Sequence, residues 1–144
     1  MDFQGRAVAV TGAGSGMGER IAHRFAEHGA AVAVVDIDAD AAAATVETIE
    51  AETAAEAVAI TADVSDADDV AGFIARTVEE FGSIDVLHNN AGIPQEATPV
   101  EEVTEATWDR IQDVNLKSAF LGAKYAVPRM REQGGGVILN TAST

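Results

Sequence analysis

Short apolar runs alternate with amphipathic segments along the whole chain. Runs of this length are typical of strands buried on both faces, and the segments between them repeat their apolar residues at helical spacing. We expect strands at residues 6–11, 31–36, 56–62, 84–89 and 136–141, and helices at residues 17–28, 39–53, 66–81 and 105–132. This alternation predicts a mostly parallel sheet with right-handed crossovers and with helices on both faces.

The predicted helix 105–132 carries two apolar faces. With roughly 100° between successive residues, two apolar stripes form on nearly opposite sides of it. One stripe consists of Ile111, Val114, Ser118, Leu121 and Tyr125, and the other of Leu116, Phe120, Ala123 and Val127. A helix that lies on a sheet needs to bury only one face. The second stripe therefore predicts contact with another helix or subunit, and we expect a homo-oligomer that forms through this helix.

The size and composition of the chain favour a single domain. It has 144 residues, of which 47% are hydrophobic, and no long polar linker divides it, so one core spanning residues 1–144 is expected. The chain contains no cysteine. It has no positively charged segment ahead of an apolar one, and no apolar run near the ~18 residues that a membrane span needs. Disulfides, secretion and membrane insertion are not indicated, and a cytoplasmic protein is expected.

Acidic residues outnumber basic ones by 24 to 9, which gives a net charge of −15. Because this charge repels nucleic acids and anionic lipids, the expected partners are small molecules or further copies of the chain. So acidic a surface repels itself at low ionic strength and suggests a high-salt cytoplasm, and an acidic mesophilic enzyme is the competing interpretation.

A glycine-rich turn, residues 11–18, separates the first predicted strand from the first predicted helix. Glycines let the backbone approach a phosphate, and a helix N-terminus attracts the anion. The spacing differs from the common G-x-G-x-x-G pattern, because Met17 stands where its last glycine belongs, and no Gly-Lys-Ser/Thr follows as in a P-loop. A plain turn without a ligand is the alternative for this segment taken alone.

Asp36 ends the second predicted strand, where a dinucleotide-binding fold places the carboxylate that accepts hydrogen bonds from the adenosine ribose. This position predicts NAD rather than NADP, because a 2′-phosphate would meet a negative side chain. Neither Ser15 nor Ile37 offers the positive charge that NADP requires. The alternative is that Asp36 starts a turn or caps the helix near Ala39, although Asp38 is also available as a cap.

Two further polar positions are assigned structural roles. His88 lies inside a predicted strand, and we expect a hydrogen-bonded interior histidine there. Ser65, followed by Asp68, predicts a capping pair at the start of the helix 66–81.

The pattern Thr-Gly-x-x-x-Gly-x-Gly, with Gly12, Gly16 and Gly18, resembles the cofactor loop of the short-chain dehydrogenase/reductase family. A glycine loop of this kind after the first strand predicts a Rossmann-type, doubly wound parallel sheet of order 3-2-1-4-5. Residues 89–92, Asn-Asn-Ala-Gly, resemble the family's N-N-A-G signature, which would tie the sheet together and run beside the nicotinamide ribose.

The resemblance also implies which residues bind the cofactor. Asp63 and Val64 end the third predicted strand, where the family holds the adenine ring. The cofactor-binding residues expected on these grounds are Gly12, Ser15, Gly16, Met17, Gly18, Asp36, Ile37, Asp63, Val64, Asn90, Ala91 and Gly92.

Two catalytic residues follow from the same resemblance. Asn115 matches the helix asparagine that holds a water in the family's proton relay, and Ser143 matches the serine that steadies the substrate carbonyl. The other possibility is that Asn115 is an ordinary helix residue and Ser143 a hydroxyl at the end of a strand. At Ala142 the family often has another serine, so the match is incomplete there. No metal is required.

The family's Tyr-x-x-x-Lys, expected beyond Ser143, has no counterpart in this sequence, and Tyr125 is expected to pack in its apolar stripe. We therefore expect the N-terminal part of a family member, truncated before the family's last two strands, with strand 136–141 as an open sheet edge. The implied reaction is hydride transfer between NAD and the hydroxyl or carbonyl carbon of a small alcohol or ketone. A noncatalytic NAD-binding sensor or oligomerisation module is the alternative.

Overall fold

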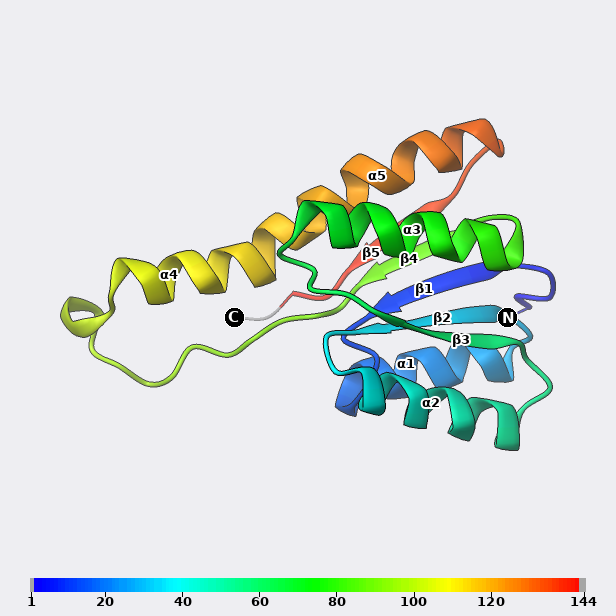
Figure 1. Cartoon of the computed structure of the whole chain (residues 1–144), viewed down its shortest axis with the longest axis horizontal. Helices are drawn as coiled ribbons and strands as arrows, with labels where there is room; N and C mark the ends of the chain where they lie inside the picture. The colour runs from blue at the N-terminus through cyan, green and yellow to red at the C-terminus, as the bar shows by residue number, and fades with distance from the viewer. Residues whose placement is uncertain (1, 143–144) are drawn as a thin grey trace.

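A parallel sheet forms the centre of the molecule (Figure 1). The structure is a computed structural model, and it describes residues 2–142. In this part of the chain the sheet has the order β3-β2-β1-β4-β5, so the predicted order is confirmed. The strands are β1 (Ala7–Thr11), β2 (Ala31–Asp36), β3 (Ala57–Thr61), β4 (Val86–Asn89) and β5 (Val137–Asn140).

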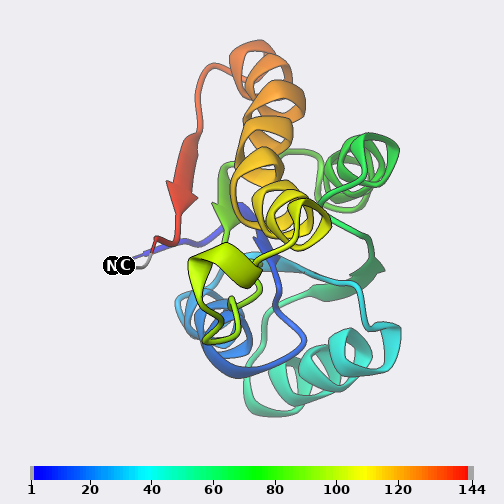
Figure 2. The same cartoon turned by 90° about the vertical axis from the view of Figure 1, so that its left-hand side faces the viewer.

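Helices cover both faces of the sheet, as Figure 2 shows end-on. Helices α1 (Gly16–Glu27) and α2 (Ala39–Glu52) lie on one face, and α3 (Ala67–Phe81) and α5 (Ser118–Glu132) lie on the other. Because successive strand residues point to opposite faces, each strand supplies both cores. Val8 and Val10 pack toward α1 and α2, whereas Ala9 packs toward α3 and α5.

The predicted helix 105–132 is one continuous helical rod with a change of winding. It consists of α4 (Glu105–Gln112), a π-helical turn (Asp113–Lys117) and α5, and α4 projects beyond the sheet (Figure 1). A short 3-10 helix (Val100–Glu102), which the sequence did not predict, precedes it.

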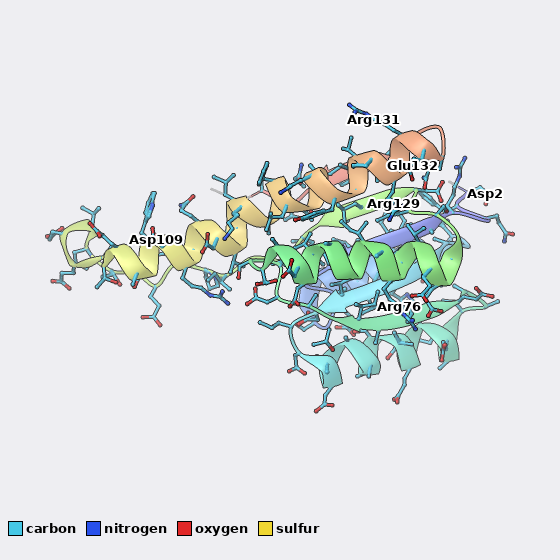
Figure 3. The ribbon with its side chains drawn as sticks, turned by 45° about the horizontal axis from the view of Figure 1, so that its top comes forward. Asp2, Arg76, Asp109, Arg129, Arg131 and Glu132 are labelled. Carbon is cyan, nitrogen blue, oxygen red and sulfur yellow. The ribbon has the colours of Figure 1, made fainter. Side chains whose placement is uncertain are left out.

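The two apolar faces of this rod have different surroundings. Val114, Ser118 and Leu121 of the first stripe are buried, and Leu121 packs in the core between the sheet and α3. On the second stripe Leu116 is 65% exposed and Phe120 is 63% exposed. Figure 3 shows that charged groups such as Arg131 also point outward from α5. None of the helices in residues 2–142 combines the length and the apolar character that crossing a membrane requires.

Aspartates begin two of the helices. Asp38 caps α2 by accepting hydrogen bonds from the backbone N–H groups of the residues two and three positions later. The prediction that Ser65 caps α3 is wrong, because Asp66 does so by accepting from the N–H groups of Asp68 and Asp69. The hydroxyl of Ser65 instead donates to Oδ1 of Asp63 and accepts a hydrogen bond from Nη1 of Arg110, so its oxygen is turned away from the N–H groups of the helix.

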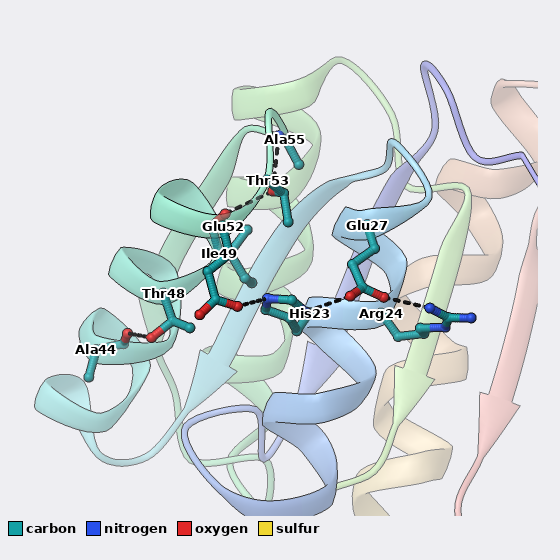
Figure 4. A network of polar contacts seen from close by, with 9 residues as sticks. All are labelled: His23, Arg24, Glu27, Ala44, Thr48, Ile49, Glu52, Thr53 and Ala55. Atoms are coloured by element: carbon teal, nitrogen blue, oxygen red, sulfur yellow. Dashed lines mark hydrogen bonds and ion pairs between the residues drawn. The ribbon is translucent and has the colours of Figure 1, made fainter.

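Helices α1 and α2 are linked by His23 (Figure 4). Its Nε2 lies 2.8 Å from Oε2 of Glu52 on α2, and its Nδ1 lies 3.6 Å from Oε1 of Glu27 on α1. The contact joins α2 to α1, the helix that starts at the glycine-rich turn.

Asp85 lies at the amino-terminal ends of β1 and β4, at the end of the sheet opposite the glycine-rich turn. Its carboxylate accepts hydrogen bonds from the backbone N–H of Ala7 at 2.9 Å, from Nη1 of Arg6 at 2.8 Å and from the hydroxyl of Ser83 at 2.8 Å. Burial by itself raises the pKa of this carboxyl, but the three hydrogen bonds outweigh it, and the net pKa is lowered. Ionised Asp85 therefore stabilises the folded state.

We expect Asp85→Asn to reduce the free energy of unfolding at pH 7 by about 2 kcal/mol, because hydrogen bonds to a charged acceptor are lost or weakened. Since the folded-state pKa lies below the unfolded one, the stabilisation is present above pH ~4 and is lost as the pH falls through the folded-state pKa. Urea unfolding over a pH series measures both effects. The control is Asp109→Asn, which changes an exposed acid on α4 (Figure 3), and an equally small effect of both variants at pH 7 would contradict the prediction.

Candidate functional site

A crevice of about 450 Å³ lies at the carboxyl ends of the strands, on both sides of β1. All of the residues that the sequence predicted to bind the cofactor line it: Gly12, Ser15, Gly16, Met17, Gly18, Asp36, Ile37, Asp63, Val64, Asn90, Ala91 and Gly92. Its wall also contains four residues that the sequence did not predict, namely Ala62, Ile93, Arg110 and Val114. Open parallel sheets place ligands at this position.

The glycine loop is packed too closely for larger residues at two positions. Gly12 has a φ of +64°, and a Cβ on it would lie 2.8 Å from the Cα of Ala91. A Cβ on Gly18 would overlap the carbonyl oxygen of Gly12 and would lie 2.7 Å from Nδ2 of Asn90. These two glycines therefore allow the loop to dock on the Asn-Asn-Ala-Gly turn.

The N-terminus of α1 opens directly into the crevice. The helix begins at Gly16, and the side chain of the capping residue Ser15 makes no hydrogen bond to the first turn. Both residues line the crevice. The first N–H groups of a helix lack partners within the helix and carry its positive dipole end, so this position can bind an anion such as a phosphate.

Asp36 presents a carboxylate to the crevice from the end of β2. Its Oδ2 accepts a hydrogen bond from the N–H of Gly14 at 2.8 Å, and its Oδ1 accepts one from the N–H of Asp38 at 3.0 Å. Asp36 thus forms a turn, as one alternative predicted, but it does not cap α2. A carboxylate offers about four lone-pair sites, so two remain for the hydroxyl groups of a ligand.

The Asn-Asn-Ala-Gly turn is held by the buried side chain of Thr11. Its Oγ1 accepts hydrogen bonds from the N–H groups of Asn90 at 3.0 Å and Ala91 at 3.1 Å. Nδ2 of Asn89 donates to Oδ1 of Asn140 at 2.9 Å, between β4 and β5. The expectation that these asparagines tie the sheet together is confirmed.

His88 differs from the fully hydrogen-bonded histidine that the sequence predicted. The hydroxyl of Thr141 donates to Oδ1 of Asn90 at 3.1 Å, so it accepts from Nε2 of His88, also at 3.1 Å. This chain of bonds assigns the proton to Nε2 and leaves the buried Nδ1 without a partner in residues 2–142. Burial lowers the pKa of His88, because the charged ring would be poorly solvated there. The prediction that His88 is fully hydrogen-bonded was therefore wrong for Nδ1.

Asn115 lies on the π-helical turn, beside Gly92. Its Oδ1 accepts from the N–H of Ile93 at 2.8 Å, and its Nδ2 donates to the carbonyl of Ile93 at 2.9 Å. The amide thus holds the chain that follows Gly92 against the helical rod. The predicted role of Asn115 in a proton relay stays a prediction, and Ser143 lies outside the described residues.

Arg110 is the one charged residue among the four crevice residues that the sequence did not predict. Its Nη1 donates to Oγ of Ser65 at 3.0 Å and lies 3.6 Å from Oδ2 of Asp63. The hydrogen bond from the Ser65 side chain is the main cause that lowers the pKa of Asp63, and the charge of Arg110 contributes to the same shift. The spacing of Arg110 and Val114, four residues apart on one helical face, is the signal that could have indicated both.

Acidic and histidine side chains do not form a metal centre in the part of the chain that the structure describes, where no three of them gather as potential ligands.

We expect Gly18→Ala to lower the free energy of unfolding by about 2 kcal/mol or more, because the added methyl group overlaps backbone that cannot move independently. Gly72→Ala on α3 is the matched control. No atom lies within 4 Å of its added Cβ, so this variant should gain about 0.5–1 kcal/mol from helix propensity. Thermal or urea unfolding compares the two variants, and a Gly18→Ala variant as stable as the wild type would disprove the packing argument.

Comparison with known proteins supports this geometry. A family model described as short chain dehydrogenase matches residues 6–144. The chain is 47% identical over 143 residues to an uncharacterized oxidoreductase of Thermotoga maritima, which covers 99% of this chain and 55% of that protein. It is 41% identical over 143 residues to levodione reductase of Leifsonia aquatica, and this match covers 98% of this chain and 53% of that protein.

A solved structure of 7α-hydroxysteroid dehydrogenase, complexed with NADH and 7-oxo glycochenodeoxycholic acid, has a TM-score of 0.93 at 34% identity. The similarity covers 99% of this chain and 55% of that one. The chain thus spans about half the length of the relatives that it matches. On the agreement of fold, motifs and overall sequence, the chain belongs to the short-chain dehydrogenase family.

Proposed function

We propose that this chain forms the NAD-binding part of an oxidoreductase that interconverts a small alcohol and the corresponding ketone. The observation that carries the proposal is the Asp36 carboxylate, which lines the same crevice as the glycine loop and the N-terminus of α1. The family relationship supports it, and a relative of known structure is a complex with NADH.

The residues of the crevice fit a dinucleotide. The N-terminus of α1 would hold the pyrophosphate, and Asp36 would accept hydrogen bonds from the adenosine ribose. Asn90, Ala91 and Gly92 would hold the nicotinamide half along the opposite wall. When bound, the nicotinamide supplies the hydride acceptor or donor of the reaction.

The charges in the crevice favour NAD over NADP. A 2′-phosphate would lie against the Asp36 carboxylate, which like-charge repulsion disfavours. Arg110 is the basic side chain on the crevice wall within residues 2–142, and it contacts Ser65 and Asp63 instead of Asp36.

Two residues are proposed to act on the substrate side. The hydroxyl of Ser143 would donate a hydrogen bond to the substrate oxygen and so stabilise the charge that develops there. Asn115 would keep the segment after Gly92 in place through its two hydrogen bonds to Ile93. Tyr125 packs against the core of α3 and α5, so it is not assigned as the proton donor.

The cofactor proposal is tested by the binding of NADH and NADPH, followed by the change in nicotinamide fluorescence. NADH should bind roughly tenfold or more tightly than NADPH, which corresponds to a repulsion of about 1.4 kcal/mol or more between the 2′-phosphate and Asp36. Asp36→Asn should weaken the binding of NADH and reduce the difference in affinity between the two cofactors. Asp40 is an exposed acid on α2, and Asp40→Asn should change neither quantity. Equal affinity of the wild type for both cofactors, or binding of neither, would contradict the proposal. A noncatalytic sensor would also bind NADH, and it would be recognised by the lack of hydride transfer in the whole protein.

We also propose that a second copy of the chain covers the outer stripe of the rod formed by α4, the π-helical turn and α5. The observation in favour is the exposure of Leu116 and Phe120 side by side on one helical face. Burying these apolar side chains against a partner removes them from water, and the free energy gained favours association.

Sedimentation of the purified chain at micromolar concentration tests this proposal. We expect the wild type to form oligomers and the double variant Leu116→Gln and Phe120→Gln to sediment as a smaller species. Val100→Gln is the control, because Val100 is 86% exposed but lies on the 3-10 helix, away from this stripe. A monomeric wild type would refute the proposal.

A further inference from the structure

The strand order determines where the purine of a bound dinucleotide would lie, an argument that rests on the proposed function. The glycine loop follows the central strand β1, and Asp36 ends the adjacent strand β2. With the pyrophosphate at the glycine loop and the ribose at Asp36, the base lies one strand further out. At that place, the end of β3, the crevice is lined by Ala62, Asp63 and Val64.

Arg110 reaches this end of the crevice from α4. Its Nη1 donates to Oγ of Ser65 at 3.0 Å and lies 3.6 Å from Oδ2 of Asp63. Oγ of Ser65 in turn donates to Oδ1 of Asp63 at 2.6 Å, and the backbone N–H of Ser65 adds a bond of 2.9 Å to the same oxygen. The three side chains form a closed ring of contacts, which we name the Arg110–Ser65–Asp63 ring.

The ring leaves one oxygen of Asp63 available in a fixed direction. Oδ1 is occupied by the two donors of Ser65, whereas Oδ2 has only the long contact to Arg110 among the described residues. An ionised carboxylate accepts hydrogen bonds and donates none. Oδ2 can therefore accept an N–H group of a base but not face an oxygen of one.

We propose that Arg110 is a positioning residue that, by holding Asp63, makes the base site selective for 6-aminopurines over 6-oxopurines. The 6-amino group of adenine would donate to Oδ2, whereas the oxygen of hypoxanthine would face a negative charge. Arg110 is also the basic group on the crevice wall in the described part of the chain, so its charge attracts any dinucleotide. That general attraction acts equally on both bases, and only the orientation of Asp63 distinguishes them.

The test compares the Kd of NADH with that of reduced nicotinamide hypoxanthine dinucleotide, which differs from NADH at the 6-position of the purine. The wild type should bind NADH more tightly, and Arg110→Met should reduce this preference by roughly threefold to fivefold, the effect of a half-exposed charged contact. Arg110→Lys should retain the attraction for both nucleotides but reduce the preference to an extent similar to that of Arg110→Met, because an ammonium group cannot reproduce the guanidinium geometry. Arg129→Met is the matched control, since Arg110 and Arg129 are both 50% exposed and Arg129, within residues 2–142, pairs only with Glu132 on α5.

A double-mutant cycle tests whether Arg110 acts through Asp63. Asp63→Asn should abolish the preference by itself, and Arg110→Met should then have no further effect on it. The inference is overturned if Arg110→Met weakens the binding of both nucleotides equally, so that the preference is unchanged. It is also overturned if Asp63→Asn and Arg110→Met have additive effects on the preference. If Arg110→Met does not fold, Ser65→Ala opens the same ring and must lower the preference. A wild type that binds neither nucleotide would overturn the proposed function itself, whereas a wild type that binds both equally would overturn only this inference.

Discussion

The docking of the glycine loop on the Asn-Asn-Ala-Gly turn is the contact on which the crevice depends. Thr11 lies at its centre, because this single buried hydroxyl accepts two backbone N–H groups of the turn and donates to the carbonyl of His88 at 3.4 Å. Segments about eighty residues apart in the chain are joined there. A larger residue than Gly12 or Gly18 would push the loop off the turn, and both walls of the crevice would move.

The same contact also connects the crevice to the interior of the sheet. His88 precedes the turn on β4, and its hydrogen bond to Thr141 continues to Asn90, so the orientation of the Asn90 amide is set by the residue that follows β5. The cost is a buried Nδ1 that receives no hydrogen bond from the described residues. Such a group is destabilising, and here it accompanies the hydrogen bonds that fix Asn90.

Local patterns were sufficient to predict the strands, their order, the glycine loop and Asp36, and the resemblance to the family supplied most of the other crevice residues. The glycine loop, Asp36 and residues 89–92 each follow a strand, and a parallel sheet brings the carboxyl ends of its strands to one edge. What the sequence could not predict depends on contacts between distant segments. The cap of α3 moved to Asp66 because Asp63 binds the hydroxyl of Ser65, and Arg110 lines the crevice only because α4 passes over that same loop. Nor does an apolar repeat distinguish a π-helical turn from an α-helix over so short a segment.

The negative charge within the crevice depends on the hydrogen-bond donors that its carboxylates receive. Asp36 and Asp63 both lie near the expected path of an anionic ligand, in a chain with a net charge of −15. Each is nevertheless held by nearby donors: Asp36 by two backbone N–H groups, and Asp63 by Ser65 and Arg110. These donors partly neutralise the carboxylates while leaving lone pairs for hydroxyl or amino groups. The phosphates can then be bound by the N-terminus of α1, which acts through backbone dipoles at short range. An acidic chain can thus bind an anionic dinucleotide without a basic surface, because the favourable interactions are directional and lie within hydrogen-bond distance, whereas the distant acidic groups are screened by salt.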